Sequence, residues 1–407
     1  MHTKNRLPWL ILLAGSIVLA LNLGIRQTLS LLIPDMLVMP TLNLGTMGLA
    51  FAIQNLIWGL TSPIAGILAD RYGSARVLAL GAVLYALGLI LAAWITQVWQ
   101  LHLELGLILG LGAGATTFPL VLAVVGKAFP PNQRSRALGL ASAGGSVGQF
   151  LMAPIMNSLN HQFGWQSTLI IVGLLALVMI PSAYFLQSEP AHKVPSTGQP
   201  SIGIRKALEQ AGQHPSFWLL NIGFFVCGFH VAFIATHLPT YVSLCGLPSN
   251  VSATGLALIG LFNIFGSLTS GYLGGKYRPK WMLSGLYGLR ALVLAIFWVA
   301  PKTPVTVLCF AAAIGFLWLS TVPLTSGALG QIFGPTYLAT LFGVVMLSHQ
   351  IGAFFGAWLG GELMELTGSF DVMWMISIGL GLLAMVIHLP VNDRPSDENP
   401  GHCVRPA

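Results

Sequence analysis

The sequence predicts an all-α membrane protein with twelve transmembrane helices in two pseudo-symmetric six-helix bundles. Three observations predict this fold class: an apolar composition, twelve apolar segments of spanning length, and an internal repeat that relates the two halves of the chain. Of the 407 residues, 55% are hydrophobic and 7% are charged, whereas a soluble domain carries about 25% charged residues. The composition therefore excludes a soluble enzyme of ordinary size.

Apolar segments separated by proline, glycine or charged residues give the predicted spans. About 20 apolar residues cross the hydrocarbon of a bilayer. We expect spans at 8–36, 44–69, 76–96, 99–127, 137–159, 165–187, 215–244, 250–275, 281–300, 303–333, 337–362 and 370–390. The first apolar run contains Arg26 and lacks a small-residue cleavage site, so we expect it to be a span and not a cleaved signal peptide.

Lysine and arginine concentrate in the cytoplasmic loops of membrane proteins. All but three of the 18 lysines and arginines fall in loops or termini on one side of the predicted bundle. The exceptions are Lys302 on the other side and Arg26 and Arg290 within spans. We therefore expect a multi-pass protein of a bacterial-type inner (cell) membrane with both termini in the cytoplasm. The net charge of +7 suits contact with anionic membrane lipid, and no stripe suited to nucleic acid is visible.

The longest polar interruption divides the chain into two halves. Its charged residues, prolines and glycine are typical of a flexible linker. The predicted domains are an N-terminal six-helix bundle over 1–187, a cytoplasmic linker over 188–214, a C-terminal six-helix bundle over 215–392 and a cytoplasmic tail over 393–407. The four cysteines have no metal-ligand spacing, so we expect neither a metal site nor a cofactor. We also expect a monomer.

The halves match each other at an offset of 204 or 205 residues, which indicates an internal repeat. Because equivalent loops fall on the same side, the repeat is parallel, and such repeats place a substrate at the interface between halves near the membrane midplane. The matched pairs are Gly24 and Gly228, Gly66 and Gly271, Thr117 and Thr321, Pro119 and Pro323, Gly139 and Gly343, and Gly148 and Gly352.

The loop between the second and third spans reads GILADRYGSAR over residues 66–76. It resembles the G-x-L-a-D-r-x-G-x-r signature of the major facilitator superfamily. The resemblance implies a gate in which Asp70 pairs with basic residues or a helix N-terminus and holds the outward-open state closed on the cytoplasmic side. The expected gating residues, which take no part in substrate recognition, are Gly66, Asp70, Arg71, Gly73 and Arg76.

A second segment, FPPNQRSRALGLASAGGSVG over 129–148, is similar to the monocarboxylate-porter signature. The chain as a whole looks closer to bacterial relatives that include oxalate/formate-antiporter-like proteins. The resemblance implies a secondary transporter working by symport or antiport. Small residues in this segment also suit close helix packing. The sequence departs from eukaryotic members, because their Asp-x-x-x-Arg pair corresponds here to Asn263 and Ser267.

Ionisable residues at membrane depth are functional-site hypotheses by default. Arg26 in span 1 and His230 in span 7 are repeat counterparts, and the resemblance places both spans at the central cavity. A guanidinium binds a carboxylate through two parallel hydrogen bonds. The alternatives are an interhelical hydrogen bond for Arg26 and a backbone-bonded neutral ring for His230. For Arg290 we expect a structural or lipid-facing role.

The charge balance within the spans favours an anionic ligand. Two cations lie within spans, while Glu104 and Asp35 are expected near the outer face. We therefore expect transport of a small organic anion, of the monocarboxylate type, with Arg26 as its charge partner, His230 assisting, and a proton or counter-anion as a possible partner. Further expected cavity residues are Asn55, Trp318, Thr321, His349 and Gln350.

Other functions fit the sequence less well. No nucleotide-binding loop or hydrolase constellation occurs, so we expect no enzyme. The remaining alternative is an efflux permease for a drug or hydrophobic metabolite, whose fifth-span signature would need a proline earlier than Pro154.

Overall fold

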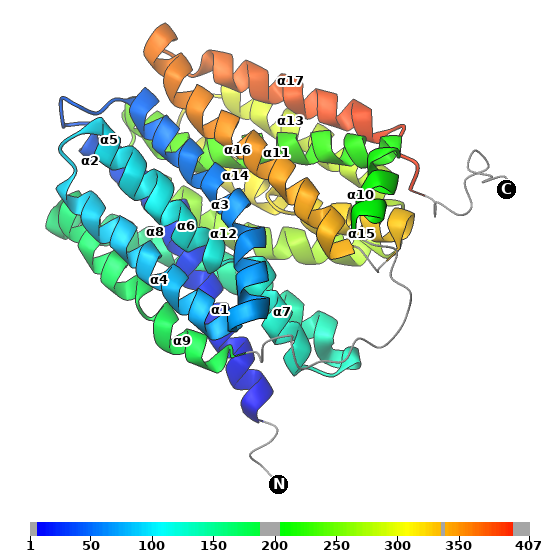
Figure 1. Cartoon of the computed structure of the whole chain (residues 1–407). Coiled ribbons are helices and arrows are strands. Elements are labelled where there is room, and N and C mark those ends of the chain that lie inside the picture. Colours follow the sequence, from blue (N-terminus) through cyan, green and yellow to red (C-terminus); the bar gives the residue numbers. More distant parts are fainter. Residues whose placement is uncertain (1–5, 188–203, 335–337, 394–407) are drawn as a thin grey trace, which may run out of the picture.

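The computed structural model describes residues 6–187, 204–334 and 338–393. Within these ranges the side chains of residues 6, 7, 131, 132, 134–136, 204, 207 and 339 are not described. The described residues form helices joined by short loops, without a strand among them. Figure 1 shows the helices of the first half and those of the second half gathered in two groups.

The first half contains spans one to six. Its helices are α1 (Arg6–Thr28), η1 (Leu29–Leu32), α2 (Ile33–Met36), α3 (Leu44–Tyr72), α4 (Ser74–Leu91), η2 (Ala92–Trp94), α5 (Val98–Leu101), η3 (His102–Ile108), α6 (Leu109–Ala115), α7 (Phe118–Ala128), α8 (Pro131–Ala176) and α9 (Met179–Phe185).

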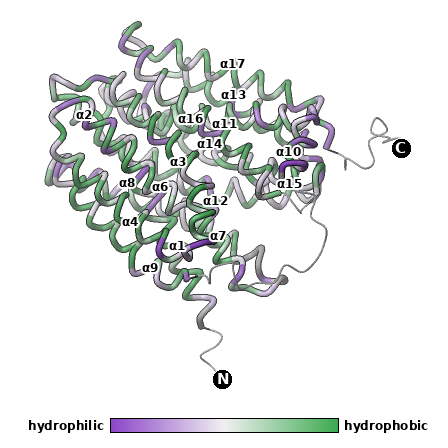
Figure 2. Tube along the Cα trace, viewed as in Figure 1, coloured by the Kyte–Doolittle hydropathy of each residue, from purple (hydrophilic) through white to green (hydrophobic). Residues whose placement is uncertain are grey.

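The second half contains spans seven to twelve, preceded by one polar helix. Its helices are α10 (Ile204–Gly212), α11 (Pro215–Leu244), α12 (Ser249–Gly274), α13 (Pro279–Val299), α14 (Pro304–Leu317), α15 (Thr321–Phe333), α16 (Leu338–Thr367) and α17 (Asp371–His388). Figure 2 shows apolar residues along the spans and polar residues concentrated at the helix ends and on α10.

The described ranges contain eleven helical segments that are long and apolar enough to cross a membrane. One of them, Ala137–Phe185, has 49 residues, and two predicted spans fall within it. Gly164 interrupts this segment with φ 75° and ψ 168°, a backbone conformation that glycine adopts without steric cost. Spans five and six therefore meet at Gly164. The predicted fold class is confirmed.

Spans four and ten are broken at equivalent positions. In span four the break separates α6 from α7 at Thr116 and Thr117, and in span ten it separates α14 from α15 at residues 318–320. Pro119 lies two residues after the first break, and its repeat counterpart Pro323 lies three residues after the second. A proline donates no backbone hydrogen bond, so the preceding turn lacks its normal ladder. The internal repeat thus accounts for the matching breaks.

Glycines allow close packing within each half. A Cβ on Gly148 of α8 would overlap the carbonyl oxygen of Ala20 on α1, and one on Gly352 of α16 would overlap that of Phe225 on α11. A second repeat pair lies at the same two contacts: Gly24 faces Gly148, and Gly228 faces His349. These glycines are the small residues that let helices approach each other inside a membrane.

The two halves meet through α3 with α16 and α8 with α12, and α3 and α16 lie side by side in Figure 1. We call the helix ends near Arg71, Arg76, Lys127, Lys276 and Lys280 the basic face, and the other ends the opposite face. At the opposite face the Leu44 backbone N–H donates to Oε1 of Glu365 at 2.9 Å. Deeper in the bundle, Asn263 donates to Ser146 at 2.9 Å.

Toward the basic face, the same four helices carry glycines with open space around them. Nothing lies within 4 Å of a Cβ built on Gly66, Gly139, Gly271 or Gly343. By contrast, a Cβ on Gly48, nearer the opposite face, would lie 2.6 Å from the Ala357 carbonyl oxygen of the other half. The contacts between halves described here therefore lie in the middle and opposite-face parts of the molecule.

Candidate functional site

Arg26 lies on α1 and reaches α3. Its Nη1 donates to Oδ1 of Asn55 at 3.0 Å, and its guanidinium carbon lies 4.2 Å from the centroid of the Trp58 ring. The side chain is half-buried, and its Nε has no hydrogen-bond partner. Both contacts are with neutral groups, and neither ion pair of the described side chains includes Arg26. The guanidinium therefore keeps a net positive charge and a free donor.

The second half approaches this site through α16. A Cβ on Gly59, the residue after Trp58, would lie 2.7 Å from Cβ of Gln350. Trp58 and Gln350 are 7% and 2% exposed, and Trp58 Nε1 and Gln350 Oε1 both lack a hydrogen-bond partner. The structure thus brings three predicted residues, Arg26, Asn55 and Gln350, to one region at the interface between halves.

His230 does not share this arrangement in the described conformation, and its role in assisting Arg26 stays a prediction. Its Nε2 lies 2.7 Å from the Ser377 carbonyl oxygen on α17, and the side chain is 1% exposed. The repeat gives Arg26 and His230 the same position on their helices, but the ring is buried between α11 and α17. In this conformation His230 therefore has the alternative role, that of a buried ring bonded to a backbone carbonyl oxygen.

Trp318, Thr321 and His349 lie around the break in span ten. Cys227 Sγ on α11 lies 3.2 Å from Thr321 Oγ1, and the ring centroid of His349 lies 5.1 Å from that of Phe224. The side chains of Trp318, Thr321 and His349 are at most 5% exposed. These three predicted cavity residues therefore form a buried cluster of the second half, separate from the contacts of Arg26.

Arg290 stabilises this same break. Its Nη2 donates to the carbonyl oxygens of Leu317 and Trp318, the latter at 2.8 Å, and the side chain is 1% exposed. The last carbonyls of a helix lack partners within that helix and carry partial negative charge. Arg290 thus caps the C-terminus of α14 inside the bundle, which agrees with the predicted structural role and rules out a lipid-facing side chain.

The predicted gating residues surround the junction between α3 and α4. Gly73 joins the two helices with φ 92°, a backbone conformation that favours glycine. The side chains of Asp70, Arg71 and Arg76 are exposed, and Asp70 takes part in neither ion pair among the described side chains. In the repeated loop, Arg278 donates through its Nε to Asp393 at 3.1 Å.

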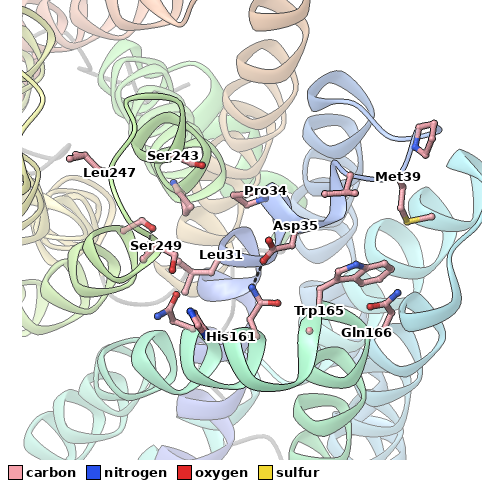
Figure 3. Close-up of a pocket in the computed structure, with 17 residues that line it drawn as sticks. Leu31, Pro34, Asp35, Met39, His161, Trp165, Gln166, Ser243, Leu247 and Ser249 are labelled. Atoms are coloured by element: carbon pink, nitrogen blue, oxygen red, sulfur yellow. Dashed lines mark hydrogen bonds between the residues drawn. The ribbon is translucent and has the colours of Figure 1, made fainter.

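A pocket of about 800 Å³ opens at the opposite face between the two halves (Figure 3). Asp35 accepts a hydrogen bond from Asn160 there, and Trp165, Ser243 and Leu247 line other parts of the wall. No motif in the sequence indicates this pocket. Its residues come from loops and helix ends of both halves, which no local motif connects.

No motif in the sequence indicates a site role for Trp58, although its spacing of three residues from Asn55 indicates a shared helix face. The predicted position of Glu104 near the outer face does not reveal its burial, and the side chain is only 8% exposed. Among the described residues, no group of three or more His, Cys, Asp or Glu side chains could hold a metal ion.

Comparison with known proteins places this chain in a family. The model described as Major Facilitator Superfamily matches residues 15–325 and 256–402. Monocarboxylate transporter 13 of Bos taurus is 28% identical over 337 residues, covering 81% of this chain and 76% of its own length. Monocarboxylate transporter 11 of Mus musculus is 26% identical, covering 94% and 86%.

Bacterial proteins give a similar result. The uncharacterized MFS-type transporter YcxA of Bacillus subtilis (strain 168) is 23% identical and covers 99% of this chain and all of its own length. Among solved structures, a bacterial homologue of the human lysosomal transporter Spinster, inward-facing and unoccupied, superimposes with a TM-score of 0.75. It is 18% identical, and the match covers 95% of this chain and 98% of that one. The chain belongs to the Major Facilitator Superfamily and is a multi-pass membrane transporter.

Proposed function

We propose that this transporter is a secondary carrier that moves a small organic anion, of the monocarboxylate type, by alternating access. The observation that carries the proposal is the state of Arg26. Its guanidinium is half-buried, contacts only neutral groups and has a buried Nε donor without a hydrogen-bond partner. A carboxylate would supply the missing negative charge and accept from Nε and Nη atoms together. The names of the monocarboxylate transporter relatives support this substrate class.

The two halves would share the ligand. Arg26 and Asn55 belong to the first half, while Gln350 of the second half lies against the same stretch of α3. Binding of a ligand between Arg26 and Gln350 would therefore depend on the relative position of the halves. Trp58 covers one face of the guanidinium, which excludes water from that side and leaves the edge of the guanidinium for the anion.

The gate and the orientation are part of the same proposal. The basic face lies in the cytoplasm, both termini with it, in the inner (cell) membrane of a bacterium, and the described conformation is then inward-facing. Asp70, Arg71 and Arg76, with Gly66 and Gly73, close the cytoplasmic end in the outward-facing state. The carrier acts as a monomer divided at 188–214 into its two halves.

Transport of labelled anions into proteoliposomes tests the substrate class. The expected result is counterflow of one or more monocarboxylates, with little transport of cations or neutral sugars. The assay also includes a hydrophobic fluorescent dye. Dye extrusion without carboxylate counterflow would contradict the proposal and favour the efflux permease.

Cysteine labelling tests the orientation. In a background where Cys245 and Cys309, both exposed, are changed to serine, Lys302→Cys should react with an impermeant maleimide in sealed cells and Arg205→Cys should not. Labelling of the second position from outside would reverse the proposed topology.

A further inference from the structure

Glu104 is a buried carboxylate without a cation partner. Two acidic side chains are buried among the described residues, Glu104 and Asp393, and Asp393 pairs with Arg278. Glu104 has no ion pair, and its Oε2 is buried without a hydrogen-bond partner. An ionised carboxylate in this setting is costly, whereas a protonated one is tolerated. This conformation therefore tolerates the neutral form of Glu104 better than the ionised form.

The local backbone is also unusual. Glu104 lies in η3, a π-helical segment over His102–Ile108, and such wide turns are frequent at functional sites. Gly88 on α4 permits this segment to approach closely, since a Cβ there would lie 2.8 Å from the Glu104 carbonyl oxygen. The segment is thus packed tightly and holds the carboxylate in a defined place.

The helices packed against η3 are α3, α4, α5 and α6. Among the described residues of these helices, Tyr85 on α4 is the titratable side chain near the level of Glu104. Its hydroxyl donates to the Asn22 carbonyl oxygen at 2.7 Å. Asp70, Arg71, Tyr72 and Arg76 lie at the basic-face ends of α3 and α4. Within η3, His102 contacts the Thr46 carbonyl oxygen through Nε2 at 3.2 Å. None of these groups neutralises Glu104.

Two consecutive residues of α3 link the segment that contains Glu104 to Arg26. Gln54 donates through Nε2 to the Leu105 carbonyl oxygen at 2.9 Å, and the next residue, Asn55, holds Arg26. Ionised Glu104 places a negative charge in the same bundle as Arg26 and disfavours a second anion there. When Glu104 is protonated, the anionic ligand can neutralise the charge of Arg26 without repulsion from a second anion.

We propose that Glu104 is the proton-binding site of this carrier and that one proton on its carboxylate accompanies one monocarboxylate on Arg26. This inference rests on the proposed function and names its coupling ion. Binding is reciprocal, because two ligands that strengthen each other do so by the same factor. The pair is electroneutral: the proton enters from water onto a Glu104 carboxylate oxygen and leaves to water on the other side, with no bond of the substrate broken.

The test compares Glu104→Gln with the wild type in proteoliposomes. Glutamine mimics the protonated state, so counterflow of the labelled monocarboxylate should stay within about threefold of wild type. Accumulation driven by an imposed pH gradient should be lost. The matched control is Asp371→Asn, an exposed acid at the opposite face that does not line the pocket, which should accumulate the anion as the wild type does.

Three outcomes would overturn the inference. They are pH-driven accumulation by Glu104→Gln, loss of counterflow in a variant that still folds, and absence of proton movement with the anion in the wild type, followed with a pH-sensitive dye. If Glu104→Gln does not fold, Glu104→Asp replaces it and should keep coupling while shifting the pH of half-maximal accumulation. Failure of wild-type counterflow would instead count against the proposed function itself.

Discussion

The two halves of this transporter share one fold, but the arginines within their spans have different roles. In the first half, Asn22 donates to the Ala113 carbonyl at the span-four break at 2.9 Å, which leaves Arg26 free to meet neutral groups. In the second half, Arg290 stabilises the equivalent break, and His230 is bonded to Ser377. Equal position in a repeat thus does not mean equal function.

This difference between the halves has a simple physical basis. Each break exposes carbonyl oxygens at the end of a half-helix, and a buried carbonyl needs a donor. An amide can meet this need without adding charge, whereas a guanidinium meets it and is partly neutralised by the helix end. The half that uses the amide keeps its arginine available for a ligand.

The largest effect is expected at Arg26. Arg26→Ala removes the free charge, and because a charge-assisted hydrogen bond is worth about 1.5–3 kcal/mol, anion affinity should fall by about 10–100-fold. Arg26→Lys keeps the charge but loses the planar fork, so its affinity should be intermediate. Binding and counterflow measure both variants. Intact transport with a lowered melting temperature in Arg26→Ala would make this arginine structural and remove the contrast between the halves.

Arg290 should show the reverse pattern. Arg290→Met retains volume but leaves the two carbonyls without a donor, which should cost about 2–4 kcal/mol. We expect a clear drop in Tm in detergent, together with near-normal anion affinity in the protein that remains folded. Asn22→Ala, which uncaps the equivalent break, is the matched comparison. A specific loss of affinity without loss of stability would assign Arg290 to the ligand.

The two ends of the interface between halves should exchange contacts during transport. Gly59 faces Gln350, and continuing this antiparallel register by seven residues on each helix brings Gly66 opposite Gly343. Gly66→Cys with Gly343→Cys should therefore crosslink only when the carrier leaves the described state. Gly45→Cys with Glu362→Cys, a pair already close because a Cβ on Gly45 would lie 3.2 Å from Oε2 of Glu362, serves as the control. Equal crosslinking rates for both pairs would argue against alternating closure.

The smallest effect is expected at His230. His230→Gln keeps a donor for Ser377, so anion affinity should stay within about twofold of wild type and stability should fall by about 1 kcal/mol or less. Measured Kd and Tm values decide this. A large loss of affinity would restore the predicted ligand contact and imply that His230 changes partner during transport.

Local patterns in the sequence determined the fold class. Apolar runs of spanning length, the offset between the halves and the 66–76 loop require no knowledge of distant contacts, because each helix satisfies its own backbone hydrogen bonds within one segment. The repeat likewise relates Gly24 to Gly228 and Pro119 to Pro323, although it does not itself predict the breaks before the two prolines. The residue limits of the two halves and their sidedness stay predictions.

Only the tertiary structure decided which polar side chains meet. The sequence placed Arg26 and His230 at one level, but the direction of a side chain depends on how each helix is rotated against its neighbours, and that rotation is set by packing. Packing turned Arg26 toward Asn55 and Trp58, turned His230 toward Ser377, placed Arg290 on the end of α14, and buried Glu104 without a cation. Long-range packing is encoded in the whole chain and not in any one motif.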